Sequence, residues 1–212
     1  MNKFLFLTLI SLISSKIIIL VGDTHFFWIA GYCMKFQFSN NKVCSTSPKK
    51  YYNDYIQVTA EIKASSSHYV KGREIYTSLH NQLSKTPQDT IVLLWLGIYE
   101  VFDAGRTFDF YKTLAQMYRG LKFKAISITG VKESKTHIKN YQVERFNEQM
   151  EAKISSSHLS NLEYVNILNG NDVNSIVVGG KKIDLTKYIQ EDGISYNSIG
   201  YNYLWEVISD KI

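Results

Sequence analysis

Three short stretches and one glycine carry the residue types that could do chemistry in this 212-residue chain. They are Gly22-Asp23-Thr24-His25, Gly72, Gly97-Ile98-Tyr99-Glu100 and Asp192-Gly193-Ile194-Ser195. Hydroxyl and carboxylate groups act as nucleophiles, as proton carriers or as hydrogen-bond partners of a polar ligand. Because ligands meet the carboxyl ends of the strands in doubly wound sheets, residues that follow strands are the first candidates for a site.

Aromatic residues lie close to the same stretches in sequence. They are Phe26, Phe27, Trp28, Tyr99 and Tyr196. Aromatic faces beside carboxylates offer stacking surface together with hydrogen-bond acceptors, which suits a glycan or an acylated sugar. The candidate binding residues are therefore Asp23, Trp28, Glu100 and Tyr196. The alternative is that the aromatic residues from Phe26 to Trp28 form the buried face of a helix.

The elements that must position these residues alternate between strand and helix. Continuous apolar runs predict strands at Lys16–Val21, Ile91–Leu96, Phe123–Gly130 and Leu162–Leu168, with one more at either Tyr55–Ile62 or His68–Val70. Apolar residues at three- and four-residue spacing predict helices over Ile75–Leu83, Phe110–Leu121, Ile138–Ile154 and Tyr201–Ile208. Asn197 or Ser198 is the expected cap of the last of these helices.

Strands separated by helices form repeated βαβ units, and this order predicts a parallel sheet covered on both faces. The fold class we expect is α/β, a three-layer α/β/α sandwich around a flavodoxin-like, doubly wound parallel sheet of about five strands. Residues 16–212 are long enough to form one domain. Gly179-Gly180 is expected to be a hairpin or loop turn before Asp192.

The four stretches, in this order, resemble the signature blocks of the SGNH/GDSL hydrolase family. That family has Gly-Asp-Ser after the first strand, a single Gly after the second, Gly-x-Asn-Asp after the third and Asp-x-x-His near the carboxyl terminus. Here VGDTHF, Gly72 in YVKGREIYTSL, LGIYE and EDGISYNSIGYNYL look like these blocks. The resemblance covers nearly the whole chain after the first 15 residues.

The resemblance implies the roles of individual residues. It gives Thr24 the nucleophile position, Asp192 the acid position and Ser195 the position of the family's histidine. It also implies an oxyanion hole built from the backbone N–H groups of Thr24 and Gly72 and from the side chain of Tyr99. The activity that it implies is ester hydrolysis by the serine-hydrolase mechanism.

Three of these positions depart from the family pattern in ways that impair that mechanism. Thr24 keeps a hydroxyl but adds a methyl group that crowds attack, and Tyr99 is several ångströms longer than an asparagine. Ser195 cannot act as a base near neutral pH, because a hydroxyl lacks the pKa of an imidazole. Loss of one triad member costs on the order of 10⁴–10⁶ in rate. His25 follows Thr24 directly and should point about 100° away from it on a helix.

Three functions therefore remain open from the sequence. The first is an exported SGNH/GDSL-hydrolase-like protein with impaired or lost esterase activity and a retained cleft for a glycan or acyl-ester ligand. The second is an active esterase or acyl hydrolase that uses Thr24 with an unorthodox base. The third is a structural or protein-interaction domain with a filled cleft.

The amino-terminal residues resemble a secretory signal peptide. Lys3 precedes the largely apolar stretch Phe4–Ile13, and Ser14-Ser15 follows it. A signal peptide over residues 1–15 predicts a secreted or extracytoplasmic protein. Because apolar character resumes at Ile17–Val21, a retained membrane anchor and a plain core segment are the alternatives. A membrane is an expected partner only if the segment is retained.

Composition and charge exclude several classes of function. The chain is 45% hydrophobic and 20% charged, which is typical of globular domains rather than disordered chains. The net charge is +5, but the basic residues are scattered, so we expect no nucleic-acid partner. Cys33 and Cys44 either pair or stay as two thiols, and without nearby histidines they form no zinc site. Phosphate-loop and dinucleotide motifs are missing, so no cofactor is expected.

Overall fold

The computed structural model describes residues 16–37, 41–45, 49–51 and 54–212. The expected signal peptide at residues 1–15 lies outside this range. A mixed sheet forms the centre of the described chain, with strand order β2-β4-β1-β5-β6-β7 and β3 paired to β4. Five of its strands are parallel, namely β4 (Asp54–Glu61), β1 (Ile17–Gly22), β5 (Ile91–Trp95), β6 (Lys122–Ile126) and β7 (Leu162–Val165). The short strands β2 (Lys42–Cys44) and β3 (Lys49–Tyr51) pair antiparallel with β4.

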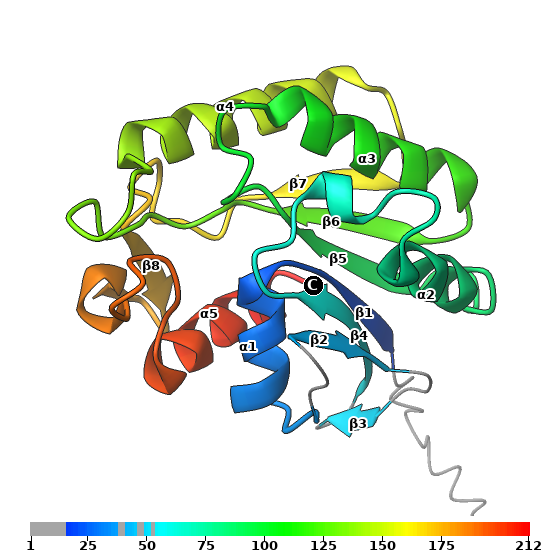
Figure 1. Ribbon diagram of the computed structural model, residues 1–212, viewed down its shortest axis with the longest axis horizontal. Coiled ribbons are helices and arrows are strands. Elements are labelled where there is room, and N and C mark those ends of the chain that lie inside the picture. Colours follow the sequence, from blue (N-terminus) through cyan, green and yellow to red (C-terminus); the bar gives the residue numbers. More distant parts are fainter. Residues whose placement is uncertain (1–15, 38–40, 46–48, 52–53) are drawn as a thin grey trace, which may run out of the picture.

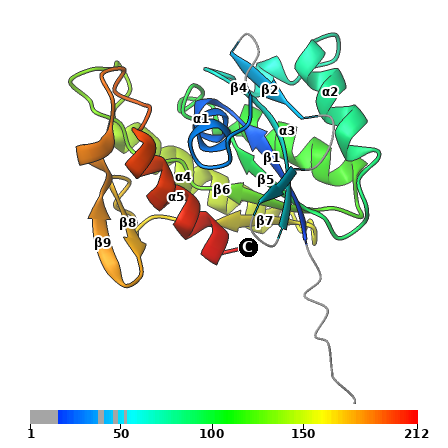
Figure 2. The ribbon, with the colours of Figure 1, turned by 90° about the horizontal axis from the view of Figure 1, so that it is seen from below.

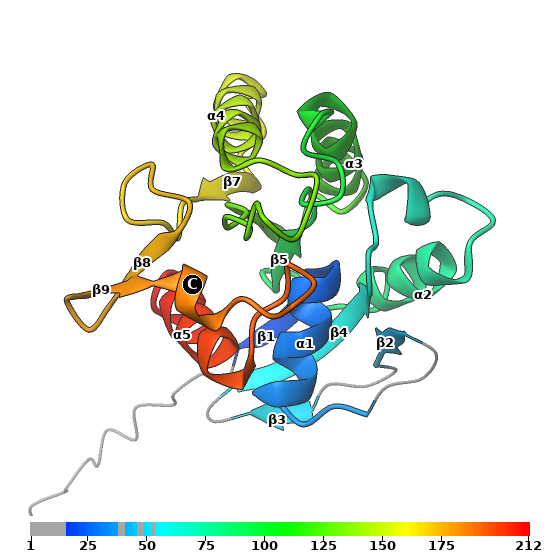
Figure 3. The ribbon, with the colours of Figure 1, turned by 60° about the vertical axis from the view of Figure 1, so that its left-hand side comes forward.

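Helices cover both faces of this sheet, which gives the three layers expected from the sequence (Figures 1 and 3). On one face lie α1 (Thr24–Tyr32) and α5 (Ser198–Asp210). On the other lie α2 (Glu74–Leu83), α3 (Ala104–Met117) and α4 (Asn140–Ser156). A hairpin of β8 (Ser175–Val178) and β9 (Lys181–Asp184) forms a second, two-stranded sheet, seen apart from the main one in Figure 2. Gly179 and Gly180 form its turn, as predicted.

The central strands are continuous apolar runs because both of their faces are covered. All five residues of β5 are buried, and Ile18–Val21 of β1 are at most 2% exposed. The predicted starts of the parallel strands agree with the structure to within a residue. The predicted strand ends at Gly130 and Leu168 were too late. Residues such as Ile128 and Ile167 leave the sheet but stay buried, so the apolar pattern continues past the strand.

The sequence left two positions for one strand, and the structure selects the first. Residues Asp54–Glu61 form β4, whereas the alternative at His68–Val70 begins at the last residue of a short 3₁₀ helix, η1 (Ser66–His68). Asn197 caps α5 as predicted, because its Oδ1 accepts hydrogen bonds from the N–H groups of Ile199 and Gly200.

The predicted helical stripes are buried in α2 and α5 but only partly in the other two helices. Met117 of α3 and Tyr141 of α4 are 54% and 64% exposed, because each lies in an end turn of its helix. Within the described ranges, none of the helices has the length and apolar character needed to cross a bilayer.

Of the two cysteines, Cys33 has a free thiol just after α1. Burial raises the pKa of this thiol to about 11, and the charge of Lys35 opposes part of the rise. The side chain of Cys44 lies outside the described part of the chain.

Candidate functional site

β1 positions Thr24 at the carboxyl edge of the sheet. β1 ends at Gly22, and Asp23 caps α1, with its Oδ1 accepting from the His25 N–H at 2.9 Å. A Cβ on Gly22 would lie 2.7 Å from the Trp95 carbonyl oxygen, so the close approach of β1 and β5 requires glycine here. Thr24 is therefore the first residue of α1 and is only 2% exposed.

β5, the third of the parallel strands along the chain, positions Tyr99 at the same edge of the sheet. Gly97 has a φ of +136°, and a Cβ there would collide with the ring of Phe146. The chain turns back at this point, with the Glu100 N–H donating to the Gly97 carbonyl at 2.8 Å. The phenol of Tyr99 reaches the Thr24 hydroxyl at 3.1 Å, so the two residues predicted from separate motifs are in contact.

The second hydrogen bond to Thr24 comes from Lys63, which sequence reasoning missed. Its backbone N–H donates to Thr24 Oγ1 at 2.8 Å. Lys63 follows β4 closely and has a φ of +58°, the left-handed conformation that favours glycine. Gly72, which the resemblance places in the oxyanion hole, lies in an exposed loop before α2 with open space around it. The useful signal would have been the end of the second parallel strand rather than the next glycine.

The stretch from Asp192 to Ser195 is stabilised by hydrogen bonds between its own residues. Asp192 accepts from the backbone N–H groups of Ile194 and Ser195 at 2.9 and 2.8 Å, and from the Ser195 hydroxyl at 2.5 Å. Burial acts to raise the pKa of the Asp192 carboxyl, but these hydrogen bonds and nearby His25 outweigh it, so the pKa is lowered. Ser195 is 3% exposed, and its hydroxyl is committed to Asp192.

The pKa of Tyr99 is governed mainly by its burial. Burial raises the pKa of the Tyr99 phenol well above its usual value, the hydrogen bond with Thr24 opposes this, and the carboxylates of Asp23 and Asp192 add to it. The phenol stays protonated at neutral pH and can donate a hydrogen bond.

The candidate binding residues are mostly enclosed. Asp23 and Tyr196 are fully buried, and the Tyr196 hydroxyl donates to the Gly130 carbonyl at 3.0 Å. Glu100 is 8% exposed and accepts from the N–H and hydroxyl of Ser66 at 2.8 and 2.9 Å, and from the Thr107 hydroxyl at 3.0 Å. Three of the four residues expected to line an open cleft thus serve intramolecular contacts.

Trp28 is the fourth expected binding residue, and it is half-buried. Its ring stacks on Tyr32 at a centroid distance of 5.2 Å, while the neighbouring Phe26 and Phe27 are buried. This part of α1 therefore matches the core-helix alternative.

Among the described residues, none of the five histidines is hydrogen-bonded to the Thr24 hydroxyl. His25 Nδ1 lies 3.1 Å from Asp23 Oδ1, and its ring packs on Trp95 at 4.8 Å. His68 contacts Ser65, and His80 contacts Tyr118. The remaining two, His137 and His158, are exposed. Among the described residues, the Thr24 hydroxyl has hydrogen bonds to Lys63 and Tyr99 only, and neither is an imidazole or a carboxylate.

A metal centre has no counterpart in the described ranges, where His, Cys, Asp and Glu form no group of three that could hold a metal ion.

Comparisons with known proteins address the fold. No family model and no curated protein sequence matches the chain. Among solved structures, a Streptococcus pneumonia protein whose description names a platelet activating factor superposes with a TM-score of 0.62. It is 15% identical, over 96% of this chain and 86% of that one.

Two further structures are similar over their whole length. A member of the lipolytic G-D-S-L family from Veillonella parvula has a TM-score of 0.53 and 12% identity, covering 92% of this chain and 97% of that one. Phospholipase A1 from Streptomyces albidoflavus has a TM-score of 0.51 and 12% identity, covering 94% and 100%. Identities this low bear on the fold alone. Strand order, helix layers and these superpositions together show that the chain has the SGNH/GDSL hydrolase fold.

Proposed function

We propose that this chain is an SGNH/GDSL-hydrolase-like protein that no longer hydrolyses esters. The observation that carries the proposal is the environment of the Thr24 hydroxyl, whose hydrogen-bond partners among the described residues are the Lys63 N–H and the Tyr99 phenol and include no base. A threonine hydroxyl attacks a carbonyl only when a neighbouring group accepts its proton. Tyr99 cannot do so near neutral pH, because its pKa is raised.

The hydrogen bonds of Asp192 support the same proposal. In the serine-hydrolase mechanism the acid orients a histidine. Here its carboxylate is occupied by Ser195 and by the backbone of its own loop. The nearby His25 contacts Asp23 instead, and its ring is 1% exposed. In the described part of the chain, neither side chain is hydrogen-bonded to Thr24.

The direct test is hydrolysis of p-nitrophenyl acetate by the purified chain. We expect no rate above the buffer background, and the same trace from Thr24→Ala. Turnover by the chain that Thr24→Ala abolishes would show that Thr24 is a working nucleophile and would overturn the proposal.

A variant designed to gain esterase activity tests the same geometry. Thr24→Ser, Tyr99→Asn and Ser195→His together restore the side chains that the resemblance implies. Because the Lys63 N–H is already in place, we expect measurable esterase activity from the triple variant. The matched control carries Ser195→Ala in place of Ser195→His and should stay inactive. Equal inactivity of both, with both folded, would mean that position 195 does not reach the nucleophile.

We also propose that the protein is exported, on the strength of residues 1–15 alone. Expression with and without these residues, followed by fractionation, tests this. Export of the longer form only supports the proposal, and retention of both forms in the cytoplasm contradicts it.

A further inference from the structure

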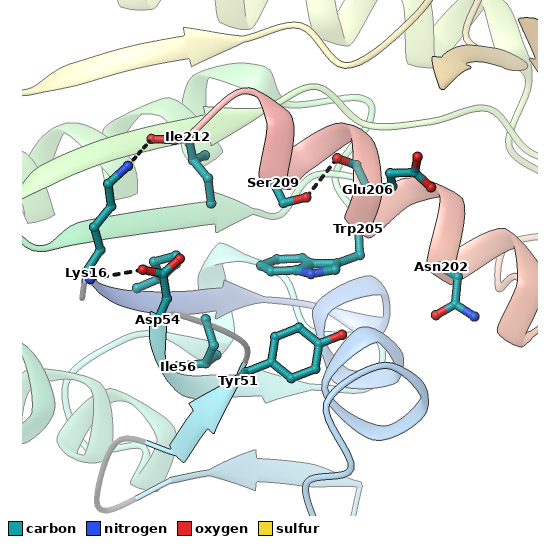
Figure 4. A pocket seen from close by; sticks show the side chains of 10 residues that line it. Lys16, Tyr51, Asp54, Ile56, Asn202, Trp205, Glu206, Ser209 and Ile212 are labelled. Carbon is teal, nitrogen blue, oxygen red and sulfur yellow. Dashed lines mark hydrogen bonds between the residues drawn. The ribbon is translucent and has the colours of Figure 1, made fainter. Parts of the chain in front are cut away.

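A pocket of about 600 Å³ opens at the amino-terminal edge of the sheet, at the end of β1 away from Thr24. It lies between the second half of α5 and the starts of β1 and β4, next to β3 (Figure 4). Figure 4 shows Lys16 and Asp54 at one end and Asn202 at the other, with the rings of Trp205 and Tyr51 between them. Asn202 belongs to the end of the fourth sequence block, whereas the other lining residues lie outside the four blocks.

One wall of the pocket is apolar and aromatic. The rings of Tyr51 and Trp205 meet edge to face at 6.3 Å. Ile18 and Ile56, which are 2% and 1% exposed, also line the pocket from the sheet. Trp205 is 9% exposed and Tyr51 is half-buried, so the two rings offer a ligand a limited but rigid surface to pack against.

The other side of the pocket offers hydrogen-bonding groups. Asn202 and Glu206 lie one turn apart on α5 and are exposed. In the described part of the chain, neither side chain has a hydrogen-bond or ion-pair partner. Asp54 accepts from the Lys16 N–H at 3.0 Å, and the Lys16 ammonium donates to the Ile212 carbonyl at 3.3 Å. An ammonium has three donors, so Lys16 keeps further capacity.

We propose that this pocket binds a neutral oligosaccharide. A sugar ring has an apolar face and a rim of hydroxyl groups that both donate and accept, which matches an aromatic wall opposite Asn202 and Glu206. An acyl chain would bury these polar groups without partners. A phosphate would meet two carboxylates, Asp54 and Glu206, against the single cation of Lys16.

This pocket lies at the opposite edge of the sheet from the glycan site that the sequence predicts near Thr24. Aromatic faces beside carboxylates were expected near Thr24, where the structure encloses them. The same combination occurs with an open pocket at Tyr51, Trp205 and Glu206. Binding of an oligosaccharide in this pocket does not depend on whether Thr24 is catalytically active.

Isothermal titration calorimetry of the purified chain with cellotriose and with chitotriose tests the proposal. We expect saturable binding of at least one of the two. Asn202→Ala and Glu206→Ala should each weaken it about tenfold, since each removes one hydrogen-bonding group. Both residues are exposed, so the variants should fold, which a thermal melt verifies. Asp210→Ala is the matched control, because it removes an exposed acid from the same helix outside the pocket, and its affinity should be unchanged.

Three results would overturn the proposal. They are no saturable binding of either sugar at millimolar concentration, equal affinity in wild type and in both pocket variants, and binding of tetramethylammonium in place of the sugars. The last result would assign the pocket to a cation. Failure of the sugar titration leaves the proposal for Thr24 unaffected, because ester hydrolysis is measured separately.

Discussion

The buried carboxylate of Glu100 joins η1 to α3 through hydrogen bonds from Ser66 and Thr107. Glu100→Gln replaces one acceptor oxygen with an NH₂ group that faces a donor. We expect a loss of about 1–3 kcal/mol in the free energy of unfolding. Urea denaturation measures it, with Glu144→Gln on the exposed face of α4 as the control. Equal stability of the two variants would show that Glu100 is not held as described.

The lowered pKa of Asp192 makes part of the stability depend on pH. Its ordinary value is 3.8, and the folded protein holds it below that value. The charged form is therefore favoured by folding, so its contribution is present above about pH 4 and is lost as the pH falls through the folded pKa. Asp192→Asn should destabilise the protein near pH 6, and the difference from wild type should shrink toward pH 3. Thermal melts across this range test it, and a difference that grows in acid would contradict it.

At the residue scale, the sequence predicts which side chains meet but not which backbone group joins them. Thr24 and Tyr99 are recognisable because each follows an apolar run and a glycine. The N–H of Lys63 carries no side-chain signal, and its left-handed conformation is one that sequence patterns assign to glycine. The enclosure of Asp23 and Tyr196 depends on how α1 and α5 pack, which local spacing does not encode.

Among the elements, α5 begins just after the Asp192–Ser195 turn and forms one wall of the oligosaccharide pocket, so its cap lies between the two. Asn197 Oδ1 accepts from two N–H groups of the first turn. Asn197→Ala should cost about 1 kcal/mol, while Asn197→Asp keeps the acceptor and should cost much less. Chemical denaturation of the two variants measures the difference. Equal losses of stability in the two variants would mean that the acceptor oxygen of Asn197 contributes nothing to the free energy of unfolding.

The length of an element decides whether the sequence reveals it. The strands β1 and β5 are apolar over five or six residues, and both were predicted from that pattern. β2 and β3 have three residues each and are partly exposed, so they carry too little pattern to predict. Their pairing to β4 is set by the sheet edge rather than by their own residues.

For the molecule as a whole, stability should decrease from the centre of the sheet outward. β1 lies between β4 and β5, whereas β8 and β9 pair only with each other. We expect the amides of Ile19 and Leu20 to exchange with deuterium far more slowly than that of Val177, which is 44% exposed. Hydrogen exchange followed by mass spectrometry measures this order. Equal protection of hairpin and sheet would indicate that the whole chain opens only as one unit.

The enclosure of the Thr24 hydroxyl, which lies between Lys63 and Tyr99 with 2% of the residue exposed, has a practical consequence. Fluorophosphonate reagents detect serine hydrolases by the reactivity of an accessible oxygen. We expect fluorophosphonate to leave this chain unlabelled, even where the protein is abundant, because the Thr24 hydroxyl is enclosed. We expect such a protein to be detected instead by capture on an immobilised ligand.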